Sequence, residues 1–350
     1  MSIYGGCVVK MGATIKDIAQ LSGVGISTVS RVLNSSGSAS KETREKVIAA
    51  AKELKYVPNN NARNLKMVHS KTILLLAKSI VNPFFQEMIK IIQNQIMLRG
   101  YSLDIQNIDG YEDEMALAKQ KVLSGNPCAL VLMGGCFGYE DADFISLGIP
   151  CVLATVKAAD TVDENLYSSV LINDKEEMAS AVEYLIGLGH KRIGCIYNNY
   201  EEAITPNKLR FEGYKMALER NGIPFDPFLV SSPKDTFDSG YKFGFNMMKY
   251  LMERNPDMTA VVTMADIMAI GAAKAVLSSG RKIPDDISIV GFDGIEVAEY
   301  YHPALDTIAQ PVQLMAQQIV EAVMEMLDGG KTSHVVLKSN LVKRGSCKAV

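Results

Sequence analysis

From Thr72 onward, short continuous apolar runs alternate with longer segments in which apolar residues recur every three or four positions. A continuous apolar run is typical of a strand buried on both faces of a parallel sheet, and the longer period is typical of a helix. The predicted strands are TILLLAK, YSLDIQN, CALVLMG, PCVLATV, RIGCIYN, PFLVSS, MTAVVTM and DISIVGFD. The predicted helices include residues 83–99, 207–221 and 265–279. So many strands separated by helices indicate two doubly wound subdomains rather than one sheet.

The head of the chain, residues 12–66, begins with three predicted helices. Thr14 and Asp17 stand at the spacing of a capping box, which predicts the start of a helix, and Gly23 ends that helix. A second short helix is predicted from about 26 to 33, and a third from 40 to 56. The third helix places its apolar residues on one face, which we assign to a small core: Val47, Ile48, Ala51 and Leu54.

The first two helices have the residue types that a helix-turn-helix needs. Ala19 is small enough to let the helices cross closely, Gly23 accepts a positive φ in the turn, and Val29 packs back onto the first helix. A helical hairpin that only packs is the alternative interpretation. The second helix carries few bulky apolar residues, however, and its outward positions suit a DNA major groove better than a core: Ile26, Ser27, Ser30 and Arg31.

The stretch from Pro58 to Leu65 is polar, rich in asparagine and too short to form a stable helix alone. Its composition is that of a flexible linker. The alternative is a segment that offers Ala62, Arg63 and Leu65 to a partner.

Charge separates these two parts of the chain. The whole chain has a net charge of −3, but residues 1–70 contain ten basic and four acidic residues. The remaining 280 residues contain 26 basic and 35 acidic residues. A small basic head on a large acidic body indicates that only the head meets a polyanion.

The run TIKDIAQLSGVGISTVSRVLN, with the later SKETREKVIAAAKELKYVPNNNARNL, resembles the LacI/GalR family of bacterial repressors over residues 13–66. The resemblance implies that 58–65 is a hinge that becomes helical on operator DNA, with Leu65 wedged into the minor groove. It also implies that Ile26, Ser27 and Arg31 read base edges, with Arg31 suited to guanine. The full set of expected DNA contacts is Thr14, Lys16, Ile26, Ser27, Ser30, Arg31, Asn34, Ala62, Arg63 and Leu65.

One residue of the head departs from that family. The family usually has serine where Gly25 stands, as the cap of the second helix. Glycine in place of a capping serine loses only about a few tenths of a kcal/mol, so the assignment stands. The change alters at most one expected phosphate contact.

The body resembles the sugar-responsive core of the same family and the periplasmic sugar-binding proteins over nearly all of residues 71–345. The resemblance rests on NPFF at 82–85, LIGLGHKRIGCI at 185–196, LRFEG at 209–213, ADIMAIG at 265–271, VGFD at 290–293 and TIAQP at 307–311. It implies a periplasmic binding protein type I fold, with an effector in the cleft between the subdomains. The effector residues carried over are Asn82, Phe84, Phe85, Arg210, Asp266, Asp293 and Gln310.

The chemistry of this set fits a sugar, since aromatic faces stack on a sugar ring and charged planar groups take its hydroxyls. Several members have a structural alternative. Phe84 and Phe85 could be core residues, and Asp266 could cap the helix that starts there. Asp293 ends an apolar strand, where a carboxylate is harder to explain by structure alone.

These observations predict the domain organisation. We expect an artefactual or disordered extension at 1–11, a helix-turn-helix domain at 12–57, a hinge at 58–70 and a ligand-binding and dimerisation domain at 71–350. The two interleaved subdomains are predicted at 71–172 plus 307–332 and at 173–306 plus 333–350. One head covers a half-site, so we expect a homodimeric repressor on a pseudo-palindromic operator, controlled by a carbohydrate effector.

Other classes of protein fit the sequence less well. An enzyme is disfavoured because the chain has no P-loop, and the glycine-rich stretch at 134–138 does not match G-x-G-x-x-G. The four histidines have no metal-binding spacing, so we expect neither a metal nor a cofactor, and the six scattered cysteines are expected to be reduced. A basic head without a signal peptide or membrane span disfavours a secreted receptor and predicts a cytoplasmic protein. The sequence leaves open whether the effector is an inducer or a corepressor.

Overall fold

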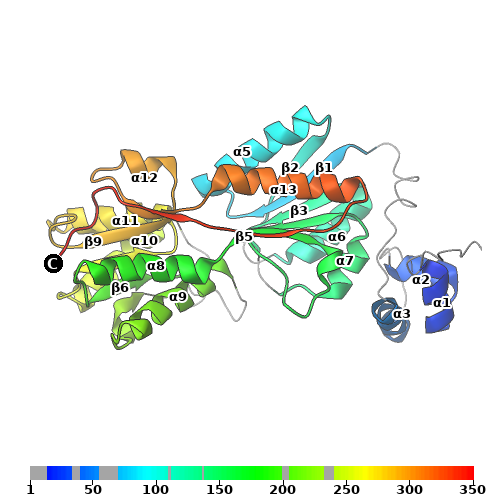
Figure 1. Ribbon diagram of the computed structural model, residues 1–350, viewed down its shortest axis with the longest axis horizontal. Coiled ribbons are helices and arrows are strands. Elements are labelled where there is room, and N and C mark those ends of the chain that lie inside the picture. The colour runs from blue at the N-terminus through cyan, green and yellow to red at the C-terminus, as the bar shows by residue number, and fades with distance from the viewer. Residues whose placement is uncertain are drawn as a thin grey trace, which may run out of the picture.

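The computed structural model describes residues 14–33, 40–54, 70–108, 112–135, 138–198, 205–231 and 240–350. Figure 1 shows a small helical head at one end, followed by two α/β subdomains arranged end to end. This architecture agrees with the fold class predicted from the sequence. Several predictions lie outside the described residues: the extension at 1–11, the hinge at 58–69, Asn34, Ala62, Arg63 and Leu65.

The described part of the head contains α1 (Ile15–Ser22), α2 (Ile26–Leu33) and α3 (Lys41–Glu53). The predicted capping box is present, since the Thr14 backbone N–H donates to the Asp17 carboxylate at 2.7 Å and the Asp17 N–H donates to the Thr14 hydroxyl. Gly23 ends α1 with a φ of +67°, as the turn requires. Val29 is fully buried and belongs to the apolar cluster that joins the three helices.

The first subdomain is built on a six-stranded parallel sheet in the order β11-β5-β4-β3-β1-β2. Its strands are β1 (Thr72–Lys78), β2 (Ser102–Ile108), β3 (Ala129–Met133), β4 (Cys151–Ala154), β5 (Ser168–Ile172) and β11 (His334–Leu337). Its helices are α5 (Pro83–Leu98), α6 (Glu114–Gly125), α7 (Asp141–Leu147) and α13 (Val312–Leu327), with a short 3₁₀ turn η1 (Glu164–Leu166).

The continuous apolar pattern of β1 follows from cover on both faces. Ile73 and Leu75 belong to one core cluster with Met88 of α5, whereas Leu74 and Leu76 belong to a second cluster. That second cluster includes residues of α6 and α7. Side chains alternate along a strand, so each face of the sheet needs its own apolar partners.

The second subdomain has the sheet order β12-β10-β9-β8-β6-β7, in which β12 alone runs antiparallel among the described strands. Its strands are β6 (Ile193–Ile196), β7 (Val230–Ser231), β8 (Ala260–Thr263), β9 (Ser288–Asp293), β10 (Asp306–Ala309) and β12 (Asn340–Val342). Its helices are α8 (Asp174–Gly187), α9 (Pro206–Arg220), α10 (Tyr241–Arg254), α11 (Asp266–Ser278) and α12 (Glu296–Tyr300), with η2 (Pro227–Leu229).

The chain crosses between the subdomains after β5, after β10 and after β11 (Figure 1). The predicted boundary at 172/173 agrees with the first crossing. The predicted boundaries at 306/307 and 332/333 are wrong by a few residues, because β10 pairs with β9 and β11 pairs with β5. Both strands have only four residues, and neither was among the strands predicted from the sequence, so the local pattern did not say which sheet they join.

Glycines allow helices of the second subdomain to approach each other closely. A Cβ added to Gly271 would lie 2.0 Å from the Tyr241 carbonyl oxygen, where α11 packs on α10. A Cβ on Gly213 would lie 2.1 Å from the Lys175 carbonyl oxygen, where α9 packs on α8. Backbone atoms cannot move aside as a flexible side chain can, so these two motif glycines are required by packing.

We predict that Gly271→Ala destabilises the second subdomain by about 1–3 kcal/mol or more, because its Cβ would force α10 and α11 apart. The thermal midpoint should fall by several degrees in calorimetry. The matched control is Gly187→Ala at the end of α8, where an added Cβ meets nothing within 4 Å. The control should keep or slightly raise the midpoint, and equal effects of both variants would contradict the close-packing explanation.

Candidate functional site

The head presents one polar face of α2 to solvent. The opposite face packs inward through Val29, Val32 and Leu33, which are all buried. The residues left exposed include three of those expected to read DNA: Ile26, Ser27 and Arg31. The helix is therefore anchored by apolar contacts on one side and exposed on the other. Ser30, which was also expected to point outward, is half-buried.

The guanidinium of Arg31 is held along this exposed face. Its Nε donates to the Ser27 carbonyl oxygen at 3.2 Å, and Nη2 donates to the Thr28 hydroxyl at 3.3 Å. Thr14 is exposed, but its side chain and backbone are engaged in the capping box, and Lys16 is exposed on α1. Thus Lys16 lies in the same small head as Ile26, Ser27 and Arg31, and none of these side chains is buried in its core.

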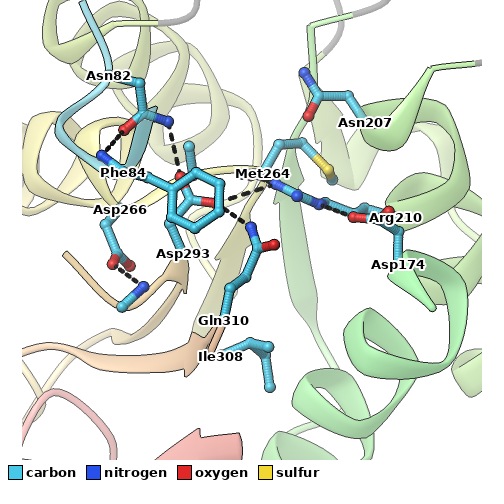
Figure 2. A network of polar contacts seen from close by, with 12 residues as sticks. Asn82, Phe84, Asp174, Asn207, Arg210, Met264, Asp266, Asp293, Ile308 and Gln310 are labelled. Carbon is cyan, nitrogen blue, oxygen red and sulfur yellow. Dashed lines mark hydrogen bonds and ion pairs between the residues drawn. The ribbon is translucent and has the colours of Figure 1, made fainter. Parts of the chain in front are cut away.

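The carboxyl ends of β1 and β9 meet between the subdomains, through Asn82 and Asp293 (Figure 2). Asn82 caps α5, with its side-chain oxygen accepting from the Phe84 N–H at 3.1 Å. Its amide nitrogen donates to Asp293 Oδ2 at 2.8 Å, across 211 positions of sequence. One short side chain therefore joins the start of the first subdomain to the end of β9 in the second.

Arg210 of α9 lies at the same place (Figure 2). Its Nε donates to Asp174 Oδ1 at 2.7 Å, its Nη1 donates to the Met264 carbonyl oxygen, and Nη1 lies 3.6 Å from Asp293 Oδ1. The guanidinium carbon also sits 3.7 Å above the centre of the Phe292 ring. We name Asn82, Asp174, Arg210, Asp293 and Gln310 the junction network. Their side chains are almost fully buried, and Arg210 is the one cation in the network, facing the carboxylates of both Asp174 and Asp293.

Two buried polar atoms that follow the carboxyl ends of strands have no hydrogen-bond partner in the described residues. Gln310 donates through Nε2 to Asp293 Oδ1 at 2.8 Å, while its Oε1 is buried and unpaired. The Thr155 hydroxyl, which follows β4, is likewise buried and unpaired. Buried polar groups normally find partners, so these two atoms mark positions where a polar ligand would be recognised.

Backbone strain gathers at the carboxyl ends of the strands. Ser79 after β1, Thr155 after β4 and Asp293 at the end of β9 have φ values of 61°, 69° and 114°. Residues other than glycine rarely adopt these φ values, and β-branched residues such as threonine adopt them least of all. Strain of this kind persists where the surrounding structure over-determines it, and it is concentrated at ligand sites.

The structure gives Asp266 a different role from the predicted effector contact. Its carboxylate is fully buried and accepts from the backbone N–H groups of Gly294 and Ile295 and from the Thr307 hydroxyl, at 2.6–2.9 Å. These donors lie outside α11, so the side chain does not cap that helix either. It fixes the loop that follows Asp293, and so it positions the junction network.

The two adjacent phenylalanines also differ from each other. Phe84 is 4% exposed and packs in the main core with Met88, which supports the core alternative for this residue. Phe85 is half-buried, and its ring lies close to Gly134, where an added Cβ would be 3.2 Å from the ring. Phe85 is therefore the better candidate for stacking on a ligand.

The sequence analysis missed Asp174 and Thr155, as well as the pair Asn198 and Asn207. Asn207 donates to Asn198 Oδ1 at 2.7 Å, beside Arg210 at the start of α9 (Figure 2). Thr155 could have been found by the argument used for Asp293, since it too is a polar residue directly after an apolar strand. Asp174 follows β5, which was not among the predicted strands.

Burial shifts the ionisation of three carboxyl groups here. Desolvation raises the pKa of Asp174 to about 6, although Arg210 opposes the rise. Desolvation, helped by the nearby Asp293, raises the pKa of Asp266 to about 7. Desolvation also raises the pKa of Asp293 above its usual range, against the pull of Arg210 and the amides of Asn82 and Gln310.

Through these shifts the three carboxyl groups add stability to the body as pH falls from about 8 to about 5, whereas His190, whose pKa is lowered by burial, opposes the trend. In this range the folded protein binds protons that the unfolded chain, with Asp pKa values of about 4, releases, so stability is lost as pH rises. Asp266→Asn keeps an oxygen for the two backbone donors and removes one titrating group. Its thermal midpoint should vary less with pH than that of wild type.

The control is Asp160→Asn, because Asp160 is exposed and Lys157 lowers its pKa. This variant should keep the wild-type pH dependence between pH 5 and 8. Parallel midpoint-versus-pH curves for wild type and Asp266→Asn would contradict the assignment.

Within the described residues, no group of three or more His, Cys, Asp or Glu side chains is arranged to hold a metal ion. The described helices also include none that is long and apolar enough to span a bilayer. The described cysteines Cys128, Cys151, Cys195 and Cys347 are free thiols.

Two family models match the chain. Residues 14–59 match bacterial regulatory proteins of the lacI family, and residues 182–347 match a periplasmic binding protein-like domain. The first match covers the helices of the head, and the second covers most of the second subdomain.

Relatives match along the whole length. The HTH-type transcriptional regulator MalR of Clostridium butyricum is 39% identical over 95% of this chain and 98% of its own. The repressor CytR of Escherichia coli (strain K12) is 32% identical over 97% of this chain and 98% of its own. The ribose operon repressor of Escherichia coli (strain K12) is 32% identical over 95% of this chain and 99% of its own.

Among solved structures, a complex of the transcriptional regulator CelR with cellobiose superimposes with a TM-score of 0.70 at 28% identity, over 95% of this chain and 99% of that one. The lac repressor dimer bound to operator and the anti-inducer ONPF gives a TM-score of 0.67 at 26% identity, over 97% and 100%.

Proposed function

The chain belongs to the LacI family of bacterial regulatory proteins, and on that premise we propose that it is a repressor that binds a two-fold symmetric operator as a homodimer and is controlled by a sugar or sugar derivative. The observation that carries the DNA-binding half is the exposed polar face of α2 on a basic head. The proposed effector control rests on the buried junction network, with the unpaired Gln310 Oε1, and on the unpaired Thr155 hydroxyl after β4.

DNA recognition is proposed to follow the helix-turn-helix mode. The first residues of α2 enter the major groove, where Ile26 offers an apolar contact and Ser27 a hydroxyl. Arg31 supplies the bidentate donor that suits guanine. Lys16 and Thr14 approach phosphates from α1, while Ala62, Arg63 and Leu65 remain proposals from the sequence for the minor groove.

A dimer is proposed because one head covers only half of a symmetric site. The first subdomain carries exposed apolar side chains at the end of α5, where Met97 is 60% and Leu98 is 87% exposed. Apolar side chains of this size on one helix end are suited to burial against a second copy. The lac repressor, whose solved structure is a dimer bound to operator, supports the same assembly.

A neutral polyol is the proposed effector class. Asp293 and Arg210 offer an acceptor and a donor, Gln310 Oε1 and the Thr155 hydroxyl offer two further polar atoms, and Phe85 offers an aromatic ring. This mixture suits the alternating hydroxyl and C–H faces of a sugar. Relatives named for ribose and a neighbour solved with cellobiose support this class.

No catalytic role is proposed, since the relatives MalR, CytR and the ribose operon repressor are regulators of transcription. The proposed site of action is the bacterial cytoplasm, where operator DNA lies. We propose neither a metal nor a cofactor.

The effector proposal is tested with full-length protein and a panel of neutral sugars that includes maltose, ribose and cellobiose. One sugar should raise the thermal midpoint and change the affinity for an operator selected from random duplexes; saturation at about 100 times Kd stabilises by about 2.7 kcal/mol. Gln310→Ala should lose most of both responses, whereas Gln317→Ala on the exposed face of α13 should keep them. Equal responses of the two variants would overturn the junction as the effector site.

The DNA-reading proposal is tested by Arg31→Ala. Loss of a bidentate contact should cost about 1–3 kcal/mol per half-site and relax selectivity at one base position. The matched control, Lys46→Ala, removes one positive charge from α3, where Lys46 pairs with Glu42 at 2.7 Å. Fluorescence anisotropy on the operator and on single-base variants should show altered selectivity for Arg31→Ala and unchanged selectivity for Lys46→Ala. Unchanged selectivity in both would exclude Arg31 as a reading residue.

A further inference from the structure

The head lies beside α7 of the first subdomain (Figure 1). Its side chains contact the face formed by α7 and η1. Ile145 of α7 is 5% exposed and belongs to the apolar cluster of the head, together with Val29 and Val47. Leu166 of η1 packs against the same cluster. At the edge of this contact, Lys52 Nζ of α3 lies 3.1 Å from Asp141 Oδ2 of α7.

Ile145 differs from its neighbours on α7. Phe144 and Leu147 pack in the core of the first subdomain, whereas Ile145 packs with the buried apolar residues of the head. Its burial therefore depends on the head being present. Without the head, α7 would expose a large aliphatic side chain that its own subdomain does not cover.

The α7–η1 face is firmly attached to its subdomain. The Phe144 ring stacks on Tyr167, with centroids 4.8 Å apart and planes inclined by 15°. Asp143 pairs with Lys119 of α6 at 2.9 Å, and Asp141 Oδ1 accepts from the Asp163 N–H at 2.9 Å. A head resting on this face moves with the first subdomain as one unit.

The contact leaves the reading face of α2 free. Ile26 remains 51% exposed, and Ser27 and Arg31 are also exposed. The surface used for docking and the surface proposed for DNA are therefore different sides of the head. Docking restricts the direction in which the head points without covering its reading residues.

We propose that the α7–η1 face is a docking surface for the head of the same chain, which orients the reading face and so raises operator affinity. Docking holds the head at a second point in addition to its covalent connection to the body. A docked head has fewer orientations available, so it loses less entropy when it binds the operator, and its affinity for the operator rises. Because the face belongs to the first subdomain, a movement of that subdomain is passed directly to the head.

Docking itself is tested without DNA, by zero-length carbodiimide cross-linking of full-length protein and mass spectrometry. An amide between Lys52 and Asp141 should form in wild type, within a single chain of monomer mass on a denaturing gel. It should decrease strongly in Ile145→Asn, which removes the apolar contact and leaves both reacting groups in place. A yield equal in both proteins, or a product found only in covalent dimers, would overturn docking within one chain.

The effect on operator binding is tested with Ile145→Asn and Ile145→Lys. Both should lower operator affinity by about tenfold and keep the effector response and the thermal midpoint of the body. Ile145→Lys separates docking from simple charge, because an added cation alone would strengthen DNA binding. Leu123→Asn, at an exposed position of α6, is the matched control and should bind as wild type does.

Unchanged or increased operator affinity in both Ile145 variants would overturn an orienting role. The docking of the head does not depend on the proposed DNA binding, whereas its effect on operator affinity does. If no operator is found at all, the proposed function fails, while the cross-link between Lys52 and Asp141 still decides whether the head docks.

Discussion

The carboxylate of Asp293 is the group on which the arrangement of the two subdomains depends. It is buried at the end of an apolar strand, where an ionised group is unfavourable unless it is paired and hydrogen-bonded. Asn82 from the first subdomain satisfies one oxygen, and Gln310 and Arg210 from the second approach the other. Neither subdomain alone provides this full set of partners, so satisfying one charge holds both together.

The same constraint shapes the residues around it. Asp293 takes a positive φ, and Asp266 holds the following loop through two backbone N–H groups. A Cβ on Gly291 would lie 2.0 Å from Asp266 Oδ1, so the glycine of the VGFD motif makes room for the carboxylate that fixes the loop. The sequence placed Asp266 and Asp293 in one ligand-binding set. In the structure Asp293 lies in the junction network, and Asp266 lies behind it and holds the loop that follows.

Local pattern and long-range pairing explain which features could be predicted. The capping box at Thr14 and the full length of β1 were predicted because both depend on residues adjacent in sequence. The sheet joined by β11, the partners of Asp266 and the missed Asp174 depend on residues brought together from distant segments. Family resemblance supplied Asn82 and Arg210, but composition could not show that Asn82 reaches Asp293.

The side chains at the contact between the head and α7 give it the strength of a reversible interaction. Lys52 is 68% exposed, and exposed ion pairs contribute about 0–1 kcal/mol. Burial of one isoleucine contributes about 1.5–3 kcal/mol, from which the loss of side-chain and head freedom must be subtracted. The net free energy of docking is therefore comparable to the few kcal/mol that separate two conformational states of a protein. A ligand can change the balance between such states by binding one of them more tightly than the other. A contact of this strength can orient the head in one state of the first subdomain and release it in another, whereas a full core interface could not.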